Sequence, residues 1–516
     1  MFILDLLAAI ALIYTLYRYA RNQKSCLPLP PGLKKLPLVG NLFGLPRSLE
    51  WEVYDKWSKE LNTDVLHLNA AGTHIIVLGS HRAAVDLLEK RSSIYSGRPR
   101  LPMVVELMGW DFNFGFMDYG ERTHRRLMHD SFHPSAAKRF RPQELRSARD
   151  FLRRLLDDQS DMMGELRQLS GEAILSSTYG LKIASKHDKF ITIAKAGIDP
   201  VVPALIPGTF LVDILPALKY VPEWFPGASF KRKAKEWRRL ALEVRDTPFE
   251  QAKREIEKGS PISSFCSNSL SKLDIRTDIH MQEEDIKSVA GTLYGGTKAL
   301  AFSYLLSLQT MGAVASCLLA LLNHPSVLKK AQEEIDRVIK PGHLPDFDDE
   351  PSLPYVAAVV KESMRWRPTA PLALPHTCHA EDEYNGYRIP KGSIILANAW
   401  AMLHDESIYP DPFSFRPERF LVEDGRSLNK EVKDPGHAIW GFGRRICPGR
   451  YMAASSIWIA VVSFIAAFDF NKVDESGGLD HGYDPGIIRI PHPFKCSIRP
   501  RNKEVEDFIR STEIYG

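Results

Sequence analysis

A short run near the C-terminal end of the chain combines the residue types that bind a flat, charged cofactor. From Trp440 to Gly449 it reads WGFGRRICPG. Its glycines, Gly443 among them, let a backbone turn tightly and approach a flat ligand closely. Arg445, just upstream of the cysteine, supplies a cation that can meet a carboxylate and help to keep the sulfur ionised. The run therefore predicts a turn that presents Cys447 as a thiolate ligand.

An apolar helix is predicted directly behind this turn. Pro448 and Gly449 open it, and Ala453 to Phe468 carries no charged residue. The N-terminal amides of a helix stabilise negative charge on a nearby sulfur, and a thiolate ligand pushes electron density onto haem iron. A buried cysteine in a turn before a core helix would explain a lone cysteine, but not the glycines, Arg445 and the helix together. We therefore expect Cys447 to be the metal ligand and the central catalytic residue.

The cysteine loop and two distant motifs resemble those of the cytochrome P450 family. The family signature is F-x-x-G-x-R-x-C-x-G, and the loop differs from it in carrying Trp440 as the first aromatic residue. This departure keeps an aromatic ring beside the cysteine. Glu362–Arg365 matches the family's E-x-x-R motif, and Phe415–Phe420 contains its P-E-R-F turn. These motifs follow the family's order over the last third of the chain.

The resemblance implies a cofactor, an electron donor and a set of binding residues. The cofactor would be heme b, iron protoporphyrin IX, with an axial thiolate, and NADPH-cytochrome P450 reductase would supply the electrons. By resemblance, Arg125, His376 and Arg445 would bind the haem propionates. Gly443 and Trp440 would complete the cofactor loop.

The same resemblance implies a buried charged triad of Glu362, Arg365 and Arg419 that locks the fold around the haem loop. A Glu and an Arg three residues apart share one helix face. A second Arg completes a network that no single partner could satisfy when buried.

The remaining pattern predicts a mainly α fold with small β-sheets, as in the cytochrome P450 fold. Residues 119–370 read almost wholly as helices. Short alternating runs at Val65–Leu68 and His74–Leu78 predict a small sheet near the start. Tyr384–Gly392 is typical of a hairpin and turn, within short strands that run from Pro371 to Pro417.

The first residues are predicted to anchor the chain in a membrane. Residues 2–17 are apolar apart from Asp5 and Thr15, and positive charge follows them. A secretory signal has the opposite order and a small-residue cleavage site, although a cleaved signal or a soluble amphipathic helix are the alternatives. We expect a transmembrane anchor over 1–20, a proline-rich linker over 21–41 and a catalytic domain over 42–516. The chain would then cross the endoplasmic reticulum membrane once, with its catalytic domain in the cytosol.

Composition excludes several other classes of protein. The formal net charge is only +4, and no basic tract interleaves with aromatic residues, so nucleic-acid binding is not expected. Six cysteines occur in 516 residues and none forms a C-x-x-C pair. This argues against a disulfide scaffold and against a zinc knuckle, and it suits a reducing compartment.

One apolar stretch in the helical region, Ile198–Pro226, is punctuated by prolines. Its prolines exclude a transmembrane helix. The stretch is either a buried loop or a second surface that touches the membrane. We favour the second interpretation, in which the stretch is also an entrance for apolar substrates.

The chain departs from the family pattern on an early helix. The family usually has Trp-Arg-x-x-Arg there, and Glu121 occupies the Trp position ahead of Arg122 and Arg125. Either one propionate contact is lost or the local register differs. We expect haem binding to be modestly weaker, not abolished.

The long central helix departs more seriously. It should contain A/G-G-x-D/E-T, whose acid and threonine deliver protons during oxygen activation. Between Gly296 and Thr310 the chain instead reads TKALAFSYLLSLQ, without a carboxylate, and counting back from His324 places Gln309 at the threonine position. A splice variant or gene-model error, a proton path through Thr297, Thr310 or water, and an inactive haem-binding protein all remain open.

The uncharged residues 299–322 are also long enough for a second membrane span. We expect a buried central helix, because a span would separate the E-x-x-R and cysteine motifs from their partners.

Three functions are compatible with these features. The first is a monooxygenase that hydroxylates or epoxidises a small apolar molecule, in secondary-metabolite biosynthesis or xenobiotic oxidation, as the resemblance to fungal microsomal members implies. The second is a haem-thiolate isomerase or dehydratase that does not use dioxygen and does not need the missing acid. The third is a haem-binding membrane protein without activity. NADPH dependence would separate the first function from the second.

Overall fold

The computed structural model describes residues 27–120, 122–183, 188–205, 208–259, 262–295, 304–473, 482–486 and 488–512. The predicted anchor, Glu121, Thr297 and most of the central insertion lie outside these residues. The chain forms two compact units, each built from several segments. Of the described residues, the first unit contains 27–99, Leu372–Met402 and Gly441–Arg445, and the second contains the others.

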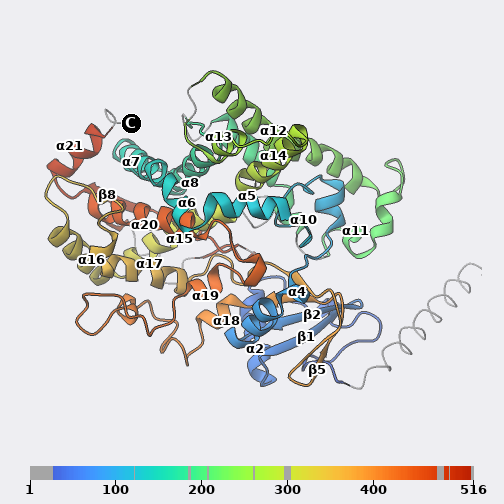
Figure 1. Ribbon diagram of the computed structural model, residues 1–516. Coiled ribbons are helices and arrows are strands. Elements are labelled where there is room, and N and C mark those ends of the chain that lie inside the picture. The colour runs from blue at the N-terminus through green and yellow to red at the C-terminus, as the bar shows by residue number, and fades with distance from the viewer. Residues whose placement is uncertain are drawn as a thin grey trace, which may run out of the picture. The chain divides into compact units, whose positions relative to one another are not determined.

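A mixed four-stranded sheet forms the centre of the first unit (Figure 1). Its strands, in spatial order, are β1 (Val65–Ala70), β2 (Thr73–Leu78), β6 (Ile394–Ala397) and β3 (His376–Thr377). Only the pairing of β2 with β6 is parallel. The predicted early strands are thus confirmed, and β6 joins them to a segment more than 300 residues later in the chain. Alternate residues of β1, Leu66 and Leu68, pack on Tyr54, as the period of a strand requires.

A hairpin follows β3 in the first unit. It joins β4 (Asp382–Tyr384) to β5 (Tyr387–Ile389) through Asn385 and Gly386, whose φ angles are 51° and 77°. A two-residue turn with two positive φ angles matches the twist of paired strands and favours Asn-Gly. The predicted hairpin is therefore confirmed. The other elements of this unit are η1 (Leu42–Gly44), α2 (Glu50–Glu60), α3 (His81–Ala84), η2 (Val85–Lys90), α4 (Ser92–Tyr95), α18 (Ala399–Leu403) and η8 (Gly443–Arg445).

The second unit is mainly helical, as predicted for residues 119–370. Its first half contains η3 (Pro102–Leu107), α5 (Arg122–Phe132), α6 (Pro134–Ala137), η4 (Lys138–Phe140), α7 (Arg141–Asp157), α8 (Met162–Tyr179), α9 (Lys189–Ile198), α10 (Val201–Ala204), α11 (Leu211–Ile214), η5 (Pro216–Tyr220), α12 (Ser229–Glu257), α13 (Phe265–Leu270) and α14 (Ile279–Gly295). Its second half contains α15 (Tyr304–Asn323), α16 (Pro325–Val338), η6 (Glu350–Ser352), α17 (Pro354–Trp366), η7 (Pro417–Phe420), α19 (Gly436–Ile439), α20 (Arg450–Ala467), β7 (Phe468–Lys472), β8 (Cys496–Pro500) and α21 (Lys503–Ser511). Strands β7 and β8 pair antiparallel.

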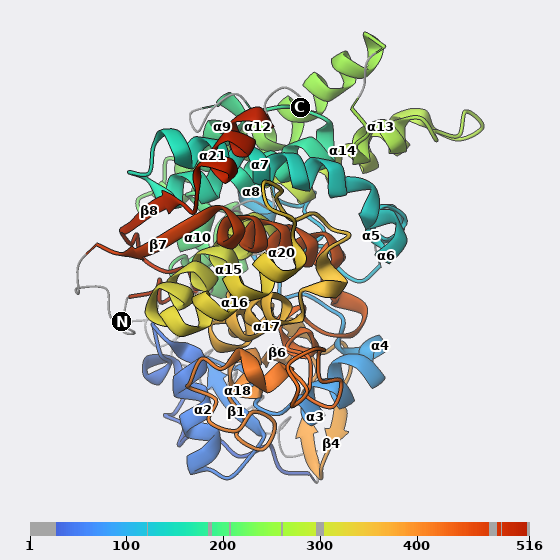
Figure 2. The same cartoon turned by 90° about the vertical axis from the view of Figure 1, so that its left-hand side faces the viewer.

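Four helices, α7, α8, α15 and α20, form the core of the second unit. Each contacts two of the others: α7 lies against α8 and α20, and α15 lies against the same two helices. In α7 the buried Ala148, Phe151, Leu152 and Leu155 repeat at the spacing of one helical face. Helix α20 is apolar on all sides, which is typical of a helix at the centre of a core. Figure 2 shows α15, α16, α17 and α20 side by side around this centre.

Two apolar stretches of the described chain are long enough to cross a membrane. One is α20, and the other is the bent pair Gln309–Asn323 and Pro325–Val338, which meet at 108°. Of the residues of α20, 67% are buried, and α15 packs on α8, α17 and α20. The helix after Cys447 is therefore confirmed as a buried core helix, and so is the described part of the central helix, Tyr304–Asn323.

Candidate active site

The predicted metal ligand lies directly before α20. The backbone N–H of Cys447 donates to the carbonyl oxygen of Trp440 at 2.8 Å. The carbonyl oxygen of Cys447 accepts from Nη1 of Arg450 at 2.9 Å. Both backbone groups of the cysteine are thus fixed, so the turn holds its side chain in a defined place at the start of α20.

The surroundings of the Cys447 thiol favour its protonated form when no metal is bound. Cys447 is partly buried, and burial raises the pKa of its thiol to about 11, against the opposing effects of the Gly449 N–H and the Arg450 charge. A thiol with this pKa carries its proton at neutral pH. Metal ligands must be deprotonated, and a bound cation lowers the pKa of the thiol. The site therefore suits a metal ligand better than a free nucleophile.

Gly443 is required by packing within the first unit. Its φ angle is +55°, and a Cβ at this position would clash with the carbonyl oxygen of Leu88. The turn η8 therefore lies directly on η2. The close approach at Gly443 is thus to the protein's own backbone, and the predicted approach to a flat ligand remains a prediction.

His376 and Arg445 are brought together in the first unit, and each is only 4% exposed. Nε of Arg445 donates to the carbonyl oxygen of Ser96 at 2.8 Å. Nδ1 of His376 lies 2.7 Å from the carbonyl oxygen of Tyr95. Burial and the positive charges of Arg98 and Arg445 lower the pKa of His376 well below its usual range. A carboxylate beside these groups would offset the two charges and favour a proton on Nε2 of His376, which could then donate to it.

Arg98 belongs to this cluster, and the sequence interpretation did not include it. Its Nη1 donates to the carbonyl oxygens of Pro375 at 2.7 Å and Leu374 at 3.3 Å, which places it beside His376. A single Arg in a loop carries no periodic or spacing signal. In a backbone bridge, the N–H of Thr377 donates to the carbonyl oxygen of Gly97 at 3.0 Å, and this brings Arg98 beside His376. The contact joins segments nearly 280 residues apart, so the sequence alone could not have identified Arg98.

Arg125 has a different environment. It lies on α5 in the second unit, with its guanidinium carbon 5.2 Å from the ring centre of Phe114 and 4.8 Å from that of Tyr119. These rings hold the guanidinium by cation–π attraction. The structure thus positions Arg125 through neighbouring aromatic residues, whereas His376 and Arg445 are positioned through backbone carbonyls.

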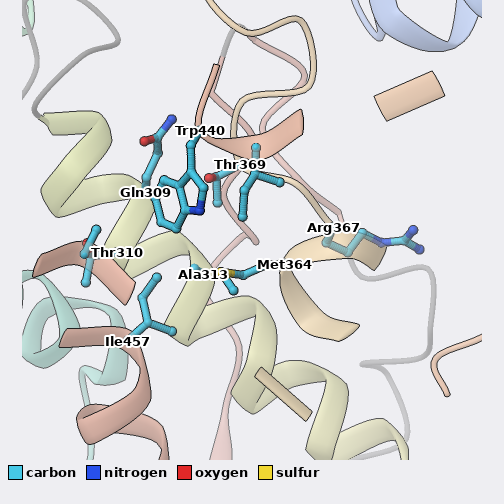
Figure 3. A pocket seen from close by; sticks show the side chains of 10 residues that line it. Gln309, Thr310, Ala313, Met364, Arg367, Thr369, Trp440 and Ile457 are labelled. Atoms are coloured by element: carbon cyan, nitrogen blue, oxygen red, sulfur yellow. The ribbon is translucent and has the colours of Figure 1, made fainter. Parts of the chain in front are cut away.

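Trp440 lines a cavity between α15 and α20 in the second unit (Figure 3). Gln309 and Thr310 reach the cavity from α15, and Ala453 and Ile457 reach it from α20. The remaining lining residues are Ala313, Met364, Arg367, Thr369 and Ile439. The position that sequence counting assigned to the missing threonine therefore faces the same space as the aromatic residue of the cysteine loop.

The predicted charged triad is confirmed. Arg365 donates to both carboxylate oxygens of Glu362, at 2.7 Å and 2.9 Å, and Nε of Arg419 donates to Glu362 at 3.1 Å. The side chains of Glu362 and Arg365 are completely buried. The backbone N–H of Arg416 adds a further bond to Glu362 at 2.8 Å. This network joins α17 to the turn η7.

The donor set fits haem. In the described part of the chain, no three His, Cys, Asp or Glu side chains are arranged to hold a metal ion. A metal bound through Cys447 would therefore need most of its ligands from a prosthetic group such as a porphyrin. The first unit offers Arg98, His376 and Arg445 for carboxylates, which is the chemistry that two propionates require.

A comparison with known protein families matches residues 30–498 to the cytochrome P450 family. The chain belongs to the cytochrome P450 family. Among curated relatives, cytochrome P450 monooxygenase 98 of Postia placenta is 43% identical over 96% of this chain and 95% of its own. Cytochrome P450 monooxygenase ple1 of Rhodocybe pseudopiperita is 42% identical over 99% and 96%. Tryptamine 4-monooxygenase of Psilocybe cyanescens is 38% identical over 94% and 95%.

Membership of the cytochrome P450 family establishes the general chemistry. P450 enzymes are oxidoreductases that bind heme b through a cysteine thiolate, so the predicted cofactor and enzyme class are confirmed. The relatives are fungal monooxygenases, which confirms the prediction of a monooxygenase of the fungal P450 type.

Proposed function

We propose that this P450 is a membrane-bound monooxygenase in which Cys447 ligates the haem iron. It hydroxylates or epoxidises a small apolar molecule, in secondary metabolism or xenobiotic oxidation. The observation that carries the proposal is the fixed turn at Cys447, which sits at the start of a buried apolar helix beside the Trp440 cavity. Haem supplies the oxygen-activating chemistry when it is bound, and NADPH-cytochrome P450 reductase supplies the electrons.

The protein's own residues bind and orient the cofactor. The thiolate of Cys447 is stabilised by the Gly449 N–H and by the charge of Arg450. Within the first unit, Arg98, His376 and Arg445 form the cluster that we propose for binding propionates, and Arg125 is the further propionate ligand that the family resemblance implies. Apolar side chains of α15 and α20 exclude water from the space in which the substrate is oxidised.

The localisation we propose is the endoplasmic reticulum membrane, with residues 1–20 as a single anchor. The described chain supplies separate support in the stretch predicted to touch the membrane. Leu211, Leu215, Tyr220, Trp224 and Phe225 are each at least half exposed. These exposed apolar side chains all fall within residues 211–225. Exposed apolar patches mark interaction sites, and aromatic residues favour the membrane interface.

Basic residues follow this apolar group directly. The first turns of α12 carry Lys231, Arg232, Lys233 and Lys235. Cations beside an exposed apolar surface favour anionic lipid headgroups. The two features together support a second contact with the bilayer.

A haem-thiolate isomerase or dehydratase is the second candidate, because α15 presents Gln309 where the oxygen-activating threonine is expected. An isomerase needs neither dioxygen nor external electrons. It would therefore convert an already oxygenated substrate in the absence of NADPH.

Isotope labelling in the presence of reductase tests the monooxygenase proposal. The full chain would be expressed in membranes with a P450 reductase, NADPH and a panel of small apolar compounds under ¹⁸O₂. The proposal predicts products that carry one labelled oxygen atom and require NADPH. Product formation without NADPH or label would instead identify an isomerase, and a haem-loaded protein without any product would contradict both candidates.

A further inference from the structure

A buried carboxyl group lies beside α20 and has no role in the site described above. Glu144 on α7 is 1% exposed. The hydroxyl of Ser455 donates to its Oε2 at 2.7 Å, whereas its Oε1 has no hydrogen-bond partner among the described residues. A buried carboxylate that lacks pairing is strongly disfavoured. The geometry therefore favours a carboxylic acid that keeps its proton.

The charges around Glu144 leave this acid able to release its proton. Burial raises the pKa of Glu144 to about 8. Ser455, Ser456 and the charge of Arg141 oppose the rise, and Glu350 adds to it. Arg141 and Glu350 also face each other at 3.6 Å. The acid is thus protonated at neutral pH, with a pKa in the range in which proton donors and acceptors are effective.

Ser456, the neighbour of Ser455, opens onto a small cavity inside the four-helix core. The cavity has a volume of about 30 Å³, enough for a water molecule. Hydroxyls line it from three helices: Ser170 and Thr178 from α8, Thr310 from α15 and Ser456 from α20. Ser170 is 3% exposed, and its Oγ has no hydrogen-bond partner in the part of the chain that is described. A water molecule is the usual partner of such a group.

Thr310 connects this cavity with the one beside Trp440. Thr310 and Ala453 line both cavities, and Figure 3 shows Thr310 on α15 near Ile457 of α20. A series of hydroxyl groups with space for water between them therefore runs from Glu144 on α7, through Ser456 and the small cavity, to Thr310. Thr310 also lines the cavity beside Trp440, where we propose that haem binds. The core helices α7, α8, α15 and α20 each contribute a polar side chain to this arrangement.

We propose that Glu144, Ser456, water in the cavity and Thr310 form a proton path that replaces the acid and threonine missing from the central helix. The proposal rests on the monooxygenase function. Monooxygenation consumes dioxygen, two electrons from NADPH and two protons, and it yields the oxidised product and water. For each proton, Glu144 protonates Ser456, Ser456 passes its own hydroxyl proton to the cavity water, and the water protonates Thr310 as Thr310 releases its proton to the haem site. Solvent then reprotonates Glu144.

Glu144→Gln tests the path because glutamine keeps the shape and the acceptor for Ser455 but has no acidic proton. The haem-thiolate spectrum and NADPH oxidation should persist in this variant, while product formed per NADPH falls at least about tenfold and hydrogen peroxide rises. Ser456→Ala and Thr310→Val should show the same uncoupling. Ser177→Ala is the control, because this buried serine lies on α8 but does not line the cavity. Its coupling should equal that of the wild type.

An infrared measurement on the haem-loaded full chain tests the acid independently of turnover. The path predicts a carboxylic C=O band at neutral pH that shifts in D₂O, disappears above about pH 9 and is absent in Glu144→Gln. Ser456→Ala should shift the band, and Ser177→Ala should not.

The outcomes separate this path from the proposed function. A wild type that forms labelled product, together with a fully coupled Glu144→Gln variant or no protonated-acid band, would overturn the path alone. A wild type without NADPH-dependent product would overturn the proposed function and the path with it.

Discussion

Burial raises the pKa of both Cys447 and Glu144, but the two groups respond to it differently. A metal cation can take the place of the proton on Cys447, because thiolates are strong ligands for iron. Glu144 has hydroxyl groups beside it and keeps its proton. At the scale of single residues, the same effect of burial on the pKa thus accompanies a proposed metal ligand in one place and a proposed acid in the other.

Glu144 should make the stability of the protein depend on pH. Folding raises its pKa from 4.5 to about 8, so between these values the folded state holds a proton that the unfolded chain has released. Stability therefore falls as pH rises through this window, by roughly 2–5 kcal/mol in total. Thermal unfolding of the wild type and of Glu144→Gln at about pH 6 and about pH 9 measures this contribution.

The variant should lose less stability than the wild type over this pH range. Equal losses in both proteins would show that Glu144 ionises in the folded state as it does in the unfolded chain.

The sequence predicts those site residues whose proposed role is encoded in local spacing. Cys447 and Arg445 share one loop, and His376 was assigned through the resemblance. Arg98 and Glu144 were not found, because a single charged residue in a loop or helix has many neutral explanations. The roles proposed for them depend on contacts with residues hundreds of positions away, such as Ser455 for Glu144.

At the scale of elements, the Glu362 network should be essential for the fold. Glu362→Gln leaves Arg365 and Arg419 buried without their countercharge, which typically costs about 3–5 kcal/mol. We expect a protein that no longer retains haem, as measured by the haem-to-protein absorbance ratio after purification. Glu506→Gln is the control, because Glu506 forms an exposed pair with Arg510. Retention of haem by both variants would contradict the structural role of the network.

Polar contacts tie the segment from α11 to η5 to the turn η3. Glu106 accepts from Arg100 at 2.7 Å and from Lys219 at 2.5 Å, and these two cations lower its pKa to about 2. Asp213 on α11 accepts from the backbone N–H of Met103 at 2.9 Å. Charge pairs thus hold a segment whose outer face is apolar.

Removing one of these charges should loosen the segment. Glu106→Gln is expected to speed amide hydrogen exchange in residues 211–220 several-fold, because local opening no longer breaks an ion pair. Glu236→Gln, which removes an exposed pair with Arg239 on α12, should leave exchange in residues 211–220 unchanged. Equal exchange in both variants would show that apolar packing alone fixes the segment.

For the molecule as a whole, membrane contact should be visible as protection. Reconstitution of the full chain into bilayers containing anionic lipid should slow hydrogen exchange in residues 211–225, which include the 79% exposed Trp224. The segment around Phe413 is an internal control, because this residue is also apolar and 57% exposed but no other large apolar side chain near it in the sequence is exposed. Protection of neither segment, or of both equally, would contradict a specific second contact.

The fold class could be predicted from the sequence more fully than the assembly of the core. The hairpin could be predicted from Asn385-Gly386, and the buried charge network could be predicted from the E-x-x-R motif at Glu362–Arg365, because both signals lie in a few neighbouring residues. The parallel pairing of β2 with β6 and the contacts of α7 with α20 join distant segments. Hydrophobic periodicity gives the buried face of a helix but not its neighbour, so the hydroxyl-lined cavity required the structure.

The central claim is that Cys447 binds haem iron as a thiolate. The reduced CO difference spectrum of the membrane-expressed full chain tests it most directly, with Cys447→Ala beside it and Cys496→Ala, a thiol in β8, as the control. We predict the red-shifted Soret band of thiolate-ligated haem in the wild type and in Cys496→Ala, and its loss in Cys447→Ala. Persistence of that band in Cys447→Ala, or its absence from the wild type, would contradict the claim.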